Sequence, residues 1–162
     1  MSQLELLPPH ARLWLFLADQ PLSQNQELRL RHELSAFTGN WKSHGHSLSA
    51  GFEILHRQII VIAVDQQAEA PSGCSIDKAF RLLQEFGRTE QLDFFNRLLV
   101  PIVGETGLMI VHRNNIPSLL AAGTLREDQP YYDLTIEHLG ALDADFCKPL
   151  NQGWVLKGLK QI

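Results

Sequence analysis

Cysteine is scarce in this sequence, and so are long apolar runs and positive charge. The 162 residues include two cysteines, Cys74 and Cys147, which are too few and too far apart for a disulfide framework. No run approaches the roughly 18 apolar residues that a membrane-spanning helix needs. The first residues lack a basic segment followed by a hydrophobic core and a cleavage site, so no signal peptide is expected. These absences favour a reducing, cytoplasmic location and no membrane partner.

The charge balance excludes little, but it argues against one class of partner. The net charge is −4 and the pI is near 5.9. Proteins dedicated to nucleic acids usually present a basic face, so no nucleic-acid partner is expected. Hydrophobic residues make up 44% of the chain and charged residues 20%, which is typical of a globular protein and not of a disordered one.

Strand and helix signals alternate along the first part of the chain. The run 11–19 is short, apolar and nearly continuous, which predicts a strand buried on both faces. Ser23 and Gln26 have the spacing of a capping box, which predicts the start of a helix. The strand-like runs 47–55 and 58–65 follow closely on one another and predict a hairpin.

A second helix and a further strand continue the series. Ser75 is a suitable cap for a helix over the residues that follow it, and 94–103 predicts the next strand. This order predicts an α+β fold with a ferredoxin-like βαββαβ antiparallel sheet and its helices on one face. In that fold the first and third strands are central, and 94–103 lies at an edge that tolerates Pro101. If 106–112 pairs beside it, that edge is covered and Pro101 is expected at a bulge.

The remaining residues are expected to extend this sheet within one domain, 1–162. The core of that domain is assigned to 1–103, and the C-terminal strand and helix segment to 104–162. The run 106–112 predicts a strand, and a short helix is expected from about Asn115 with Pro117 in its first turn. From 126 onward the pattern does not separate strand from helix.

The expected topology brings two unusual loops to the same end of the sheet. The loop 40–47 contains a His-Gly-His sequence, and the loop 65–77 contains Gly-Cys-Ser at the start of the second helix. Free backbone amides and the positive end of the helix dipole favour an anion or a thiolate at such a helix start. The sequence therefore predicts a site where these loops meet.

Cys74 is the candidate nucleophile of this site. A helix N-terminus or a nearby imidazole can lower a thiol pKa below its free value of about 8.5, and His44 or His46 would then act as the base. The groups expected to bind the ligand are Lys42, Asp65, Ser72, Gly73, Ser75 and Asp77. The predicted function is binding of a small anionic ligand, with cysteine-dependent chemistry and enzymatic activity left open.

Three other interpretations of the same residues stay open. Cys74 can be a buried structural residue in a non-enzymatic structural or protein-interaction module. A zinc ion held by His44, His46, Cys74 and a carboxylate would need only common ligands, but no CxxC or HExxH motif supports it, so no metal or cofactor is assigned. The run 107–112 can form the exposed edge of a homodimer.

Polar residues at the other end of the expected sheet receive no functional role. They are expected to form a solvated rim, since a single aspartate among basic residues is not a metal-binding acid set. The members of this group are Asp19, His56, Arg57, Asn96 and Arg97.

Two motifs carry a resemblance to a known family. The segment W-x-x-H-G begins at Trp41, S-G-C-S-I-D spans 72–77, and an arginine follows in F-x-R at Arg97. Together with a late Pro-Leu and Trp154, these motifs resemble a family of small bacterial proteins of unknown function, some of which are labelled ABC transporter ATPases. The sequence has no G-x-x-x-x-G-K-[ST] loop to hold phosphates, so ATPase activity is not expected.

Overall fold

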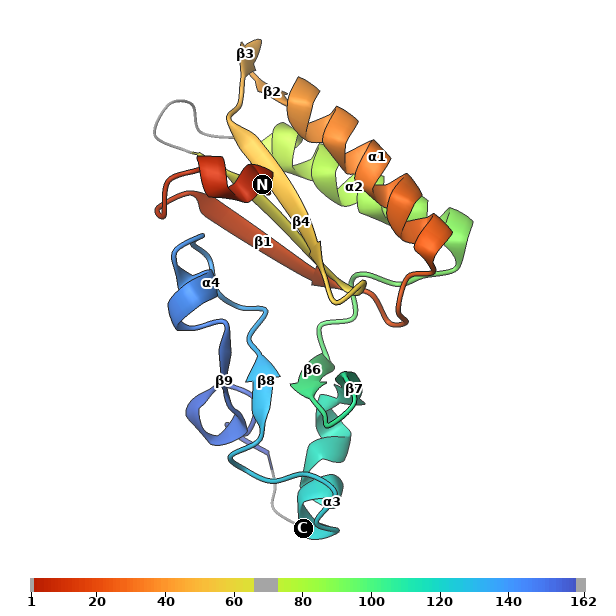
Figure 1. Ribbon diagram of the computed structural model, residues 1–162, viewed down its shortest axis with the longest axis vertical. Helices are drawn as coiled ribbons and strands as arrows, with labels where there is room; N and C mark the ends of the chain where they lie inside the picture. Colours follow the sequence, from red (N-terminus) through yellow and green to blue (C-terminus); the bar gives the residue numbers. More distant parts are fainter. Residues whose placement is uncertain (1, 66–72, 160–162) are drawn as a thin grey trace.

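The computed structural model describes residues 2–65 and 73–159, and only the backbone of Cys74 (Figure 1). The chain forms a mixed α+β structure in which the described sheets are antiparallel. The general α+β class predicted from the sequence is therefore confirmed. No described helix is long and apolar enough to cross a membrane.

The first sheet has three strands with β5 at its centre. The strands β1 (Arg12–Leu17), β5 (Ile59–Val64) and β4 (Ala50–Leu55) follow one another across the sheet. Every residue of β5 is buried, as its continuous run of Ile, Val and Ala predicts for a strand covered on both faces. Ile60 lies opposite Phe16 on one side and Ile54 on the other.

Two long helices cover one face of this sheet (Figure 1). They are α1 (Gln24–Asn40) and α2 (Gly73–Glu90). The predicted capping box is confirmed, since Ser23 Oγ accepts from the Gln26 amide at 3.1 Å and the Gln26 side chain accepts from the Ser23 amide at 2.8 Å. Along the chain, α1 is followed by a small hairpin of two strands of two residues each, β2 (Lys42–Ser43) and β3 (His46–Ser47).

The second sheet contains the later strands. Its order is β7 (Leu108–His112), β6 (Leu99–Val103), β8 (Pro130–Tyr132) and β9 (Cys147–Pro149). The short helices α3 (Ile116–Ala121) and α4 (Ala141–Ala144) connect these strands, and the 3₁₀ turns are η1 (Gln3–Leu6), η2 (Arg113–Asn115) and η3 (Leu150–Gln152).

Three apolar clusters hold these parts together. One fills the space between the helices and the first sheet, and a second lies inside the second sheet around Ile102, Tyr131 and Leu150. The third joins the other face of the first sheet, including Leu13 and Val61, to side chains of the C-terminal segments. The C-terminal segments therefore cover the sheet face that the helices leave open.

The ferredoxin-like order is not confirmed, because the strand after α2 does not join the first sheet. β6 pairs with β7 and β8, so β1 is an edge strand and not a central one within the described residues. Local pairing explains this choice, since β6 and β7 are joined by a tight turn whose closure costs little entropy.

Pro101 lies in β6 between two strands, which differs from the edge position expected for it. The Arg113 amide donates to the Leu98 carbonyl, so even-numbered residues of β6 face β7 and the nitrogen of Pro101 faces away from it. On that other side, pairing with β8 is confined to Ile102 and Tyr131. The missing N–H of the proline therefore removes no bond from the long ladder.

Candidate functional site

The two loops of the sequence-predicted site do meet in the structure. Trp41 Nε1 donates to the Ser75 carbonyl at 3.0 Å, and Ser75 Oγ donates to the Lys42 carbonyl at 3.0 Å. Trp41 and Ser75 are both buried. These bonds fasten the start of the β2–β3 hairpin to the first turn of α2.

The Ser75 side chain has a structural role that the sequence did not indicate. α2 begins at Gly73, so Ser75 lies inside its first turn and the predicted cap at Ser75 is wrong. Its hydroxyl points to the backbone of the hairpin. The residue as a whole is only 4% exposed. Ser75 therefore fastens the hairpin to the helix.

The other residues expected at this site are mostly on the surface. Lys42, His44, His46, Gly73 and Asp77 are exposed. His44 has φ 50° in the tight turn between β2 and β3, followed by Gly45 at φ 80°. This left-handed backbone explains the glycine of the His-Gly-His sequence, because glycine adopts positive φ without a steric cost.

Three further expectations about this site have different outcomes. Asp65 contacts His10, with Nε2 to Oδ1 at 3.4 Å, so the carboxylate lies beside a histidine outside the two loops. Ser72 and the side chain of Cys74 lie outside the described residues. In the part of the chain that the structure describes, no three His, Cys, Asp or Glu side chains are grouped to hold a metal ion.

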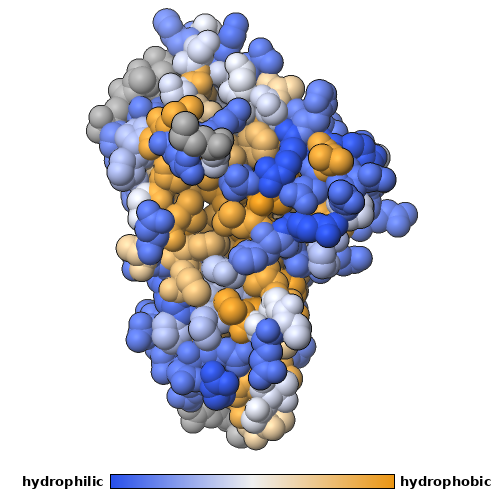
Figure 2. All heavy atoms as spheres, viewed as in Figure 1, coloured by the Kyte–Doolittle hydropathy of each residue, from blue (hydrophilic) through white to orange (hydrophobic). Residues whose placement is uncertain are grey.

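A second candidate site is a cleft along the edge of β1. Its volume is about 930 Å³. Figure 2 shows apolar atoms gathered at the waist of the molecule, where the first sheet faces the C-terminal segments. Three stretches of chain form most of the wall, namely β1 itself, 94–101 and 134–137.

Aromatic rings line the side of the cleft that faces α2. Phe16 of β1 makes edge-to-face contacts with Phe80 of α2 and with Phe95, at centroid distances of 5.5 and 5.8 Å. Phe95 is 40% exposed and Leu98 is 43% exposed, although both are large and apolar. Clusters of exposed apolar side chains on a folded protein mark interaction surfaces more often than isolated ones do.

The backbone of β1 faces the cleft with hydrogen-bonding groups. At one end of the edge the Leu13 amide donates to the Glu137 carbonyl at 2.9 Å, and at the other the Asp19 amide donates to the Asp93 carbonyl at 2.9 Å. Since backbone direction alternates along a strand, Leu15 and Leu17 also point their amides and carbonyls away from β5. Neither residue has a hydrogen-bond partner on this side among the described residues.

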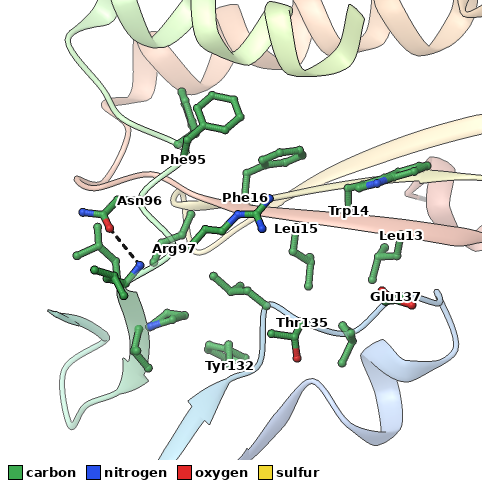
Figure 3. A pocket seen from close by; sticks show the side chains of 18 of the residues that line it. Leu13, Trp14, Leu15, Phe16, Phe95, Asn96, Arg97, Tyr132, Thr135 and Glu137 are labelled. Atoms are coloured by element: carbon green, nitrogen blue, oxygen red, sulfur yellow. Dashed lines mark hydrogen bonds between the residues drawn. The ribbon is translucent and has the colours of Figure 1, made fainter. Parts of the chain in front are cut away.

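Two arginines give the cleft its positive charge. Arg12 lies 3.6 Å from the Glu137 carboxylate and 5.5 Å over the ring of Trp14. Arg97 is exposed, and no carboxylate of the described residues lies within ion-pair distance of it. Figure 3 shows its side chain extending from the 94–101 segment toward β1. Arg97 is therefore the cation available to a ligand.

The sequence predicts a solvated rim without function for a group of polar residues that includes Asn96 and Arg97. For these two residues that prediction is incomplete. Asn96 and Arg97 line the cleft, whereas Arg57 pairs with Glu27 at 3.5 Å. The sequence signal that could have indicated this cleft is the Phe94-Phe95 pair directly before Asn96 and Arg97. In the structure Phe94 packs against Phe86 of α2, and Phe95 packs against Phe16 of β1.

Comparison with known proteins finds no match: no family model, curated protein or solved structure matches this chain. The resemblance to the bacterial family carried by Trp41 to Gly45 and 72–77 stays a prediction. The geometry of the two candidate sites is therefore the basis for any functional proposal.

Proposed function

We propose that this protein is a binding module whose β1 cleft holds an elongated apolar ligand that carries negative charge. The observation that supports this proposal best is the combination of an apolar cleft of about 930 Å³ with Arg97, which has no acidic partner in the described chain. Ligand sites commonly have volumes of roughly 300–1,000 Å³ and few polar groups among apolar walls.

Each wall of the cleft contributes to this binding in a physical way. Phe16, Phe80 and Phe95 offer ring faces and edges, and each Å² of apolar surface removed from water contributes about 25 cal/mol. A guanidinium binds carboxylate or phosphate oxygens through paired N–H donors. The apolar walls therefore supply affinity, and Arg97 selects ligands that carry an anionic group.

The dye anilinonaphthalene sulfonate tests this proposal, since it is apolar and anionic. We expect the folded protein to bind the dye with enhanced fluorescence, and Phe95→Asp to weaken binding by about tenfold, or about 1.4 kcal/mol. Leu28→Asp is the matched control, because Leu28 is 61% exposed on α1 and does not line the cleft. Equal dye binding by the two variants would contradict the proposal.

Arginine substitutions test the charge of the ligand in the same assay. Arg97→Gln should weaken dye binding, and Arg88→Gln should not, because Arg88 is an exposed residue of α2 outside the cleft. The Arg97 effect should shrink as salt is raised, since ion pairs near the surface are screened over about 10 Å at 0.1 M salt. An effect of equal size for both arginines would show that net charge alone is responsible.

We propose the loop site as a second binding site, for a small anionic ligand with Cys74 as its candidate nucleophile. The hydrogen bonds of Ser75 and Trp41 support it, because they hold Lys42 beside the first turn of α2. His44 and His46 belong to the same hairpin and are accessible to a ligand.

The pH dependence of Cys74 alkylation in the folded protein tests the thiol chemistry, with Cys147 replaced by serine because Cys147 is exposed and would also react. A reaction midpoint well below about 8.5 would indicate an activated thiolate. Reaction only after unfolding would favour the alternative, a buried structural cysteine in a non-enzymatic interaction module.

A further inference from the structure

We infer that the occupant of the β1 cleft is an extended segment of another polypeptide, which binds by adding a strand to the free edge of β1. This inference rests on the proposed binding function of the cleft and names its ligand class. It starts from the backbone of Leu15 and Leu17, whose amides and carbonyls point into the cleft without partners among the described residues.

The unpaired backbone groups require a partner with a matching pattern. Unpaired amides and carbonyls at a strand edge form a template for another strand, since backbone groups left without partners are costly. A small apolar ligand would cover Leu15 and Leu17 but would not supply alternating donors and acceptors, whereas an extended peptide does so along its whole length.

The chain itself shows that this edge accepts an extended segment. At its N-terminal end the edge is bridged in antiparallel fashion by the segment around His138, with the Leu13 amide bonded to Glu137 and the Leu139 amide bonded to Ala11. That segment then leaves the edge, and the next contact is Asp19 with Asp93. The open stretch between these contacts accommodates about four residues of a strand at roughly 3.4 Å per residue.

The two sides of the open stretch specify the side chains of the added strand. Side chains directed toward α2 meet Phe16, Phe80 and Phe95, and those directed the other way meet apolar residues such as Leu15 and Ile136. Arg97 extends into the cleft toward β1 and adds a cation there. The favoured segment is therefore a short apolar strand with an acidic side chain or a terminal carboxylate beside it.

The walls of the cleft favour a single strand over a second copy of this chain. The segment 94–101 lies near the C-terminal end of β1 and the segment 134–137 beside its N-terminal half, as Figure 3 shows for Phe95, Arg97, Thr135 and Glu137. The open stretch of edge between these segments has room for a short strand, whereas an edge-to-edge dimer would have to bring a whole sheet and its helices to β1. A linear peptide of another protein is thus the occupant that this geometry accommodates.

A library of random linear peptides displayed on phage, selected against the whole protein, supplies the probe. The tightest binder is then synthesised with one backbone N-methyl group at each position in turn. Strand addition predicts that alternate positions lose at least about tenfold in affinity while the positions between them lose much less, because every second amide of a strand faces its neighbour. A flat profile, or failure to select any binder, would overturn the inference.

Substitutions at Leu15 test the same hydrogen bonds from the protein side. Leu15→Pro removes the amide that faces the cleft, and it leaves the ladder to β5 intact because that ladder uses the neighbouring residues. Leu15→Ala is the matched control, since it shortens the side chain but keeps the amide. Peptide affinity should fall at least about tenfold further in the proline variant than in the alanine variant. Equal affinities would count against strand addition.

The outcomes separate this inference from the cleft proposal. Dye binding that depends on Phe95, together with a flat N-methyl profile, would overturn strand addition and leave the cleft as a ligand site. Dye binding indifferent to Phe95→Asp would remove the cleft proposal itself. A concentration-dependent dimer abolished by Phe95→Asp would identify a second copy as the occupant and overturn the peptide inference. If Leu15→Pro does not fold, the N-methyl profile on the unaltered protein decides.

Discussion

Replacing Asp133 by asparagine is expected to lower the free energy of unfolding by about 2 kcal/mol near neutral pH. Asp133 is buried at the end of β8, in the stretch of chain that leads to the cleft. Its Oδ1 accepts from the Thr135 amide at 2.9 Å and from the Thr135 hydroxyl at 2.6 Å, and Lys148 Nζ lies 3.1 Å from Oδ2.

The magnitude follows from which of these contacts asparagine keeps. The amide oxygen can still accept from Thr135, but the amide nitrogen cannot accept from Lys148. A hydrogen bond to a charged group contributes about 1.5–3 kcal/mol, and breaking a fully buried ion pair costs about 3–5 kcal/mol. Because the Lys148 side chain is 22% exposed and can turn to solvent, the lower part of this range applies.

The loss of unfolding free energy in Asp133→Asn should depend on pH, and the surroundings of Asp133 determine the direction. Burial raises the pKa of Asp133, but hydrogen bonds from Thr135 and the charge of Lys148 outweigh it and hold the pKa below its ordinary value. A lowered folded-state pKa stabilises the fold fully above the unfolded value of about 3.9, and this stabilisation is lost as the pH falls through the folded value. The difference in unfolding free energy between wild type and Asp133→Asn should therefore become smaller at acidic pH.

Urea unfolding followed by circular dichroism at fixed ionic strength measures this difference. Asp128→Asn is the matched control, because the Asp128 side chain is 72% exposed in its pair with Arg126 and such surface pairs contribute about 0–1 kcal/mol. Equal losses for the two variants would refute the reasoning. So would a deficit for Asp133→Asn that stays constant from about pH 7 to about pH 3, across the ordinary aspartate pKa.

Three further substitutions test the fold itself. Gly153→Ala should destabilise by about 2–3 kcal/mol in urea unfolding, because an added Cβ would overlap the Tyr131 ring and hydroxyl; an unchanged midpoint would contradict this contact. Ser23→Ala should cost about 1 kcal/mol by the same assay and Ser23→Thr much less, since threonine keeps the capping oxygen. Phe16→Pro should abolish folding while Leu15→Pro folds, as judged by circular dichroism; a folded Phe16→Pro beside an unfolded Leu15→Pro would show that the direction of the β1 edge is misassigned.

Much of the local structure could be predicted because it depends on neighbouring residues. The capping box at Ser23 and Gln26 needs only the spacing of a hydroxyl and an amide. The burial of β5 follows from its unbroken apolar run. The meeting of the two loops also followed, since α1 and α2 lie on the same face of the sheet and the bonds among Trp41, Lys42 and Ser75 join their ends.

The role of individual site residues was harder to predict. Ser75 was assigned as a helix cap and ligand group, but its hydroxyl is used to bind the Lys42 carbonyl. The sequence predicts a place for Asp65 in the loop site, but in the structure its carboxylate contacts His10, a residue distant in sequence. A side chain's partner depends on which segments are packed beside it, and residue type alone carries no information about that.

The sequence by itself determined the long helices and the main strands before residue 126, because hydrophobic period and capping residues act within a few positions of the chain. Only the tertiary structure decided which strand edge stays open. The apolar run that forms β6 was equally suited to pair with β1 or with the next run, which forms β7. Pairing with β7 costs less chain entropy because only a short turn joins the two strands. That choice leaves Leu15 and Leu17 facing a cleft, and with it the proposed binding site.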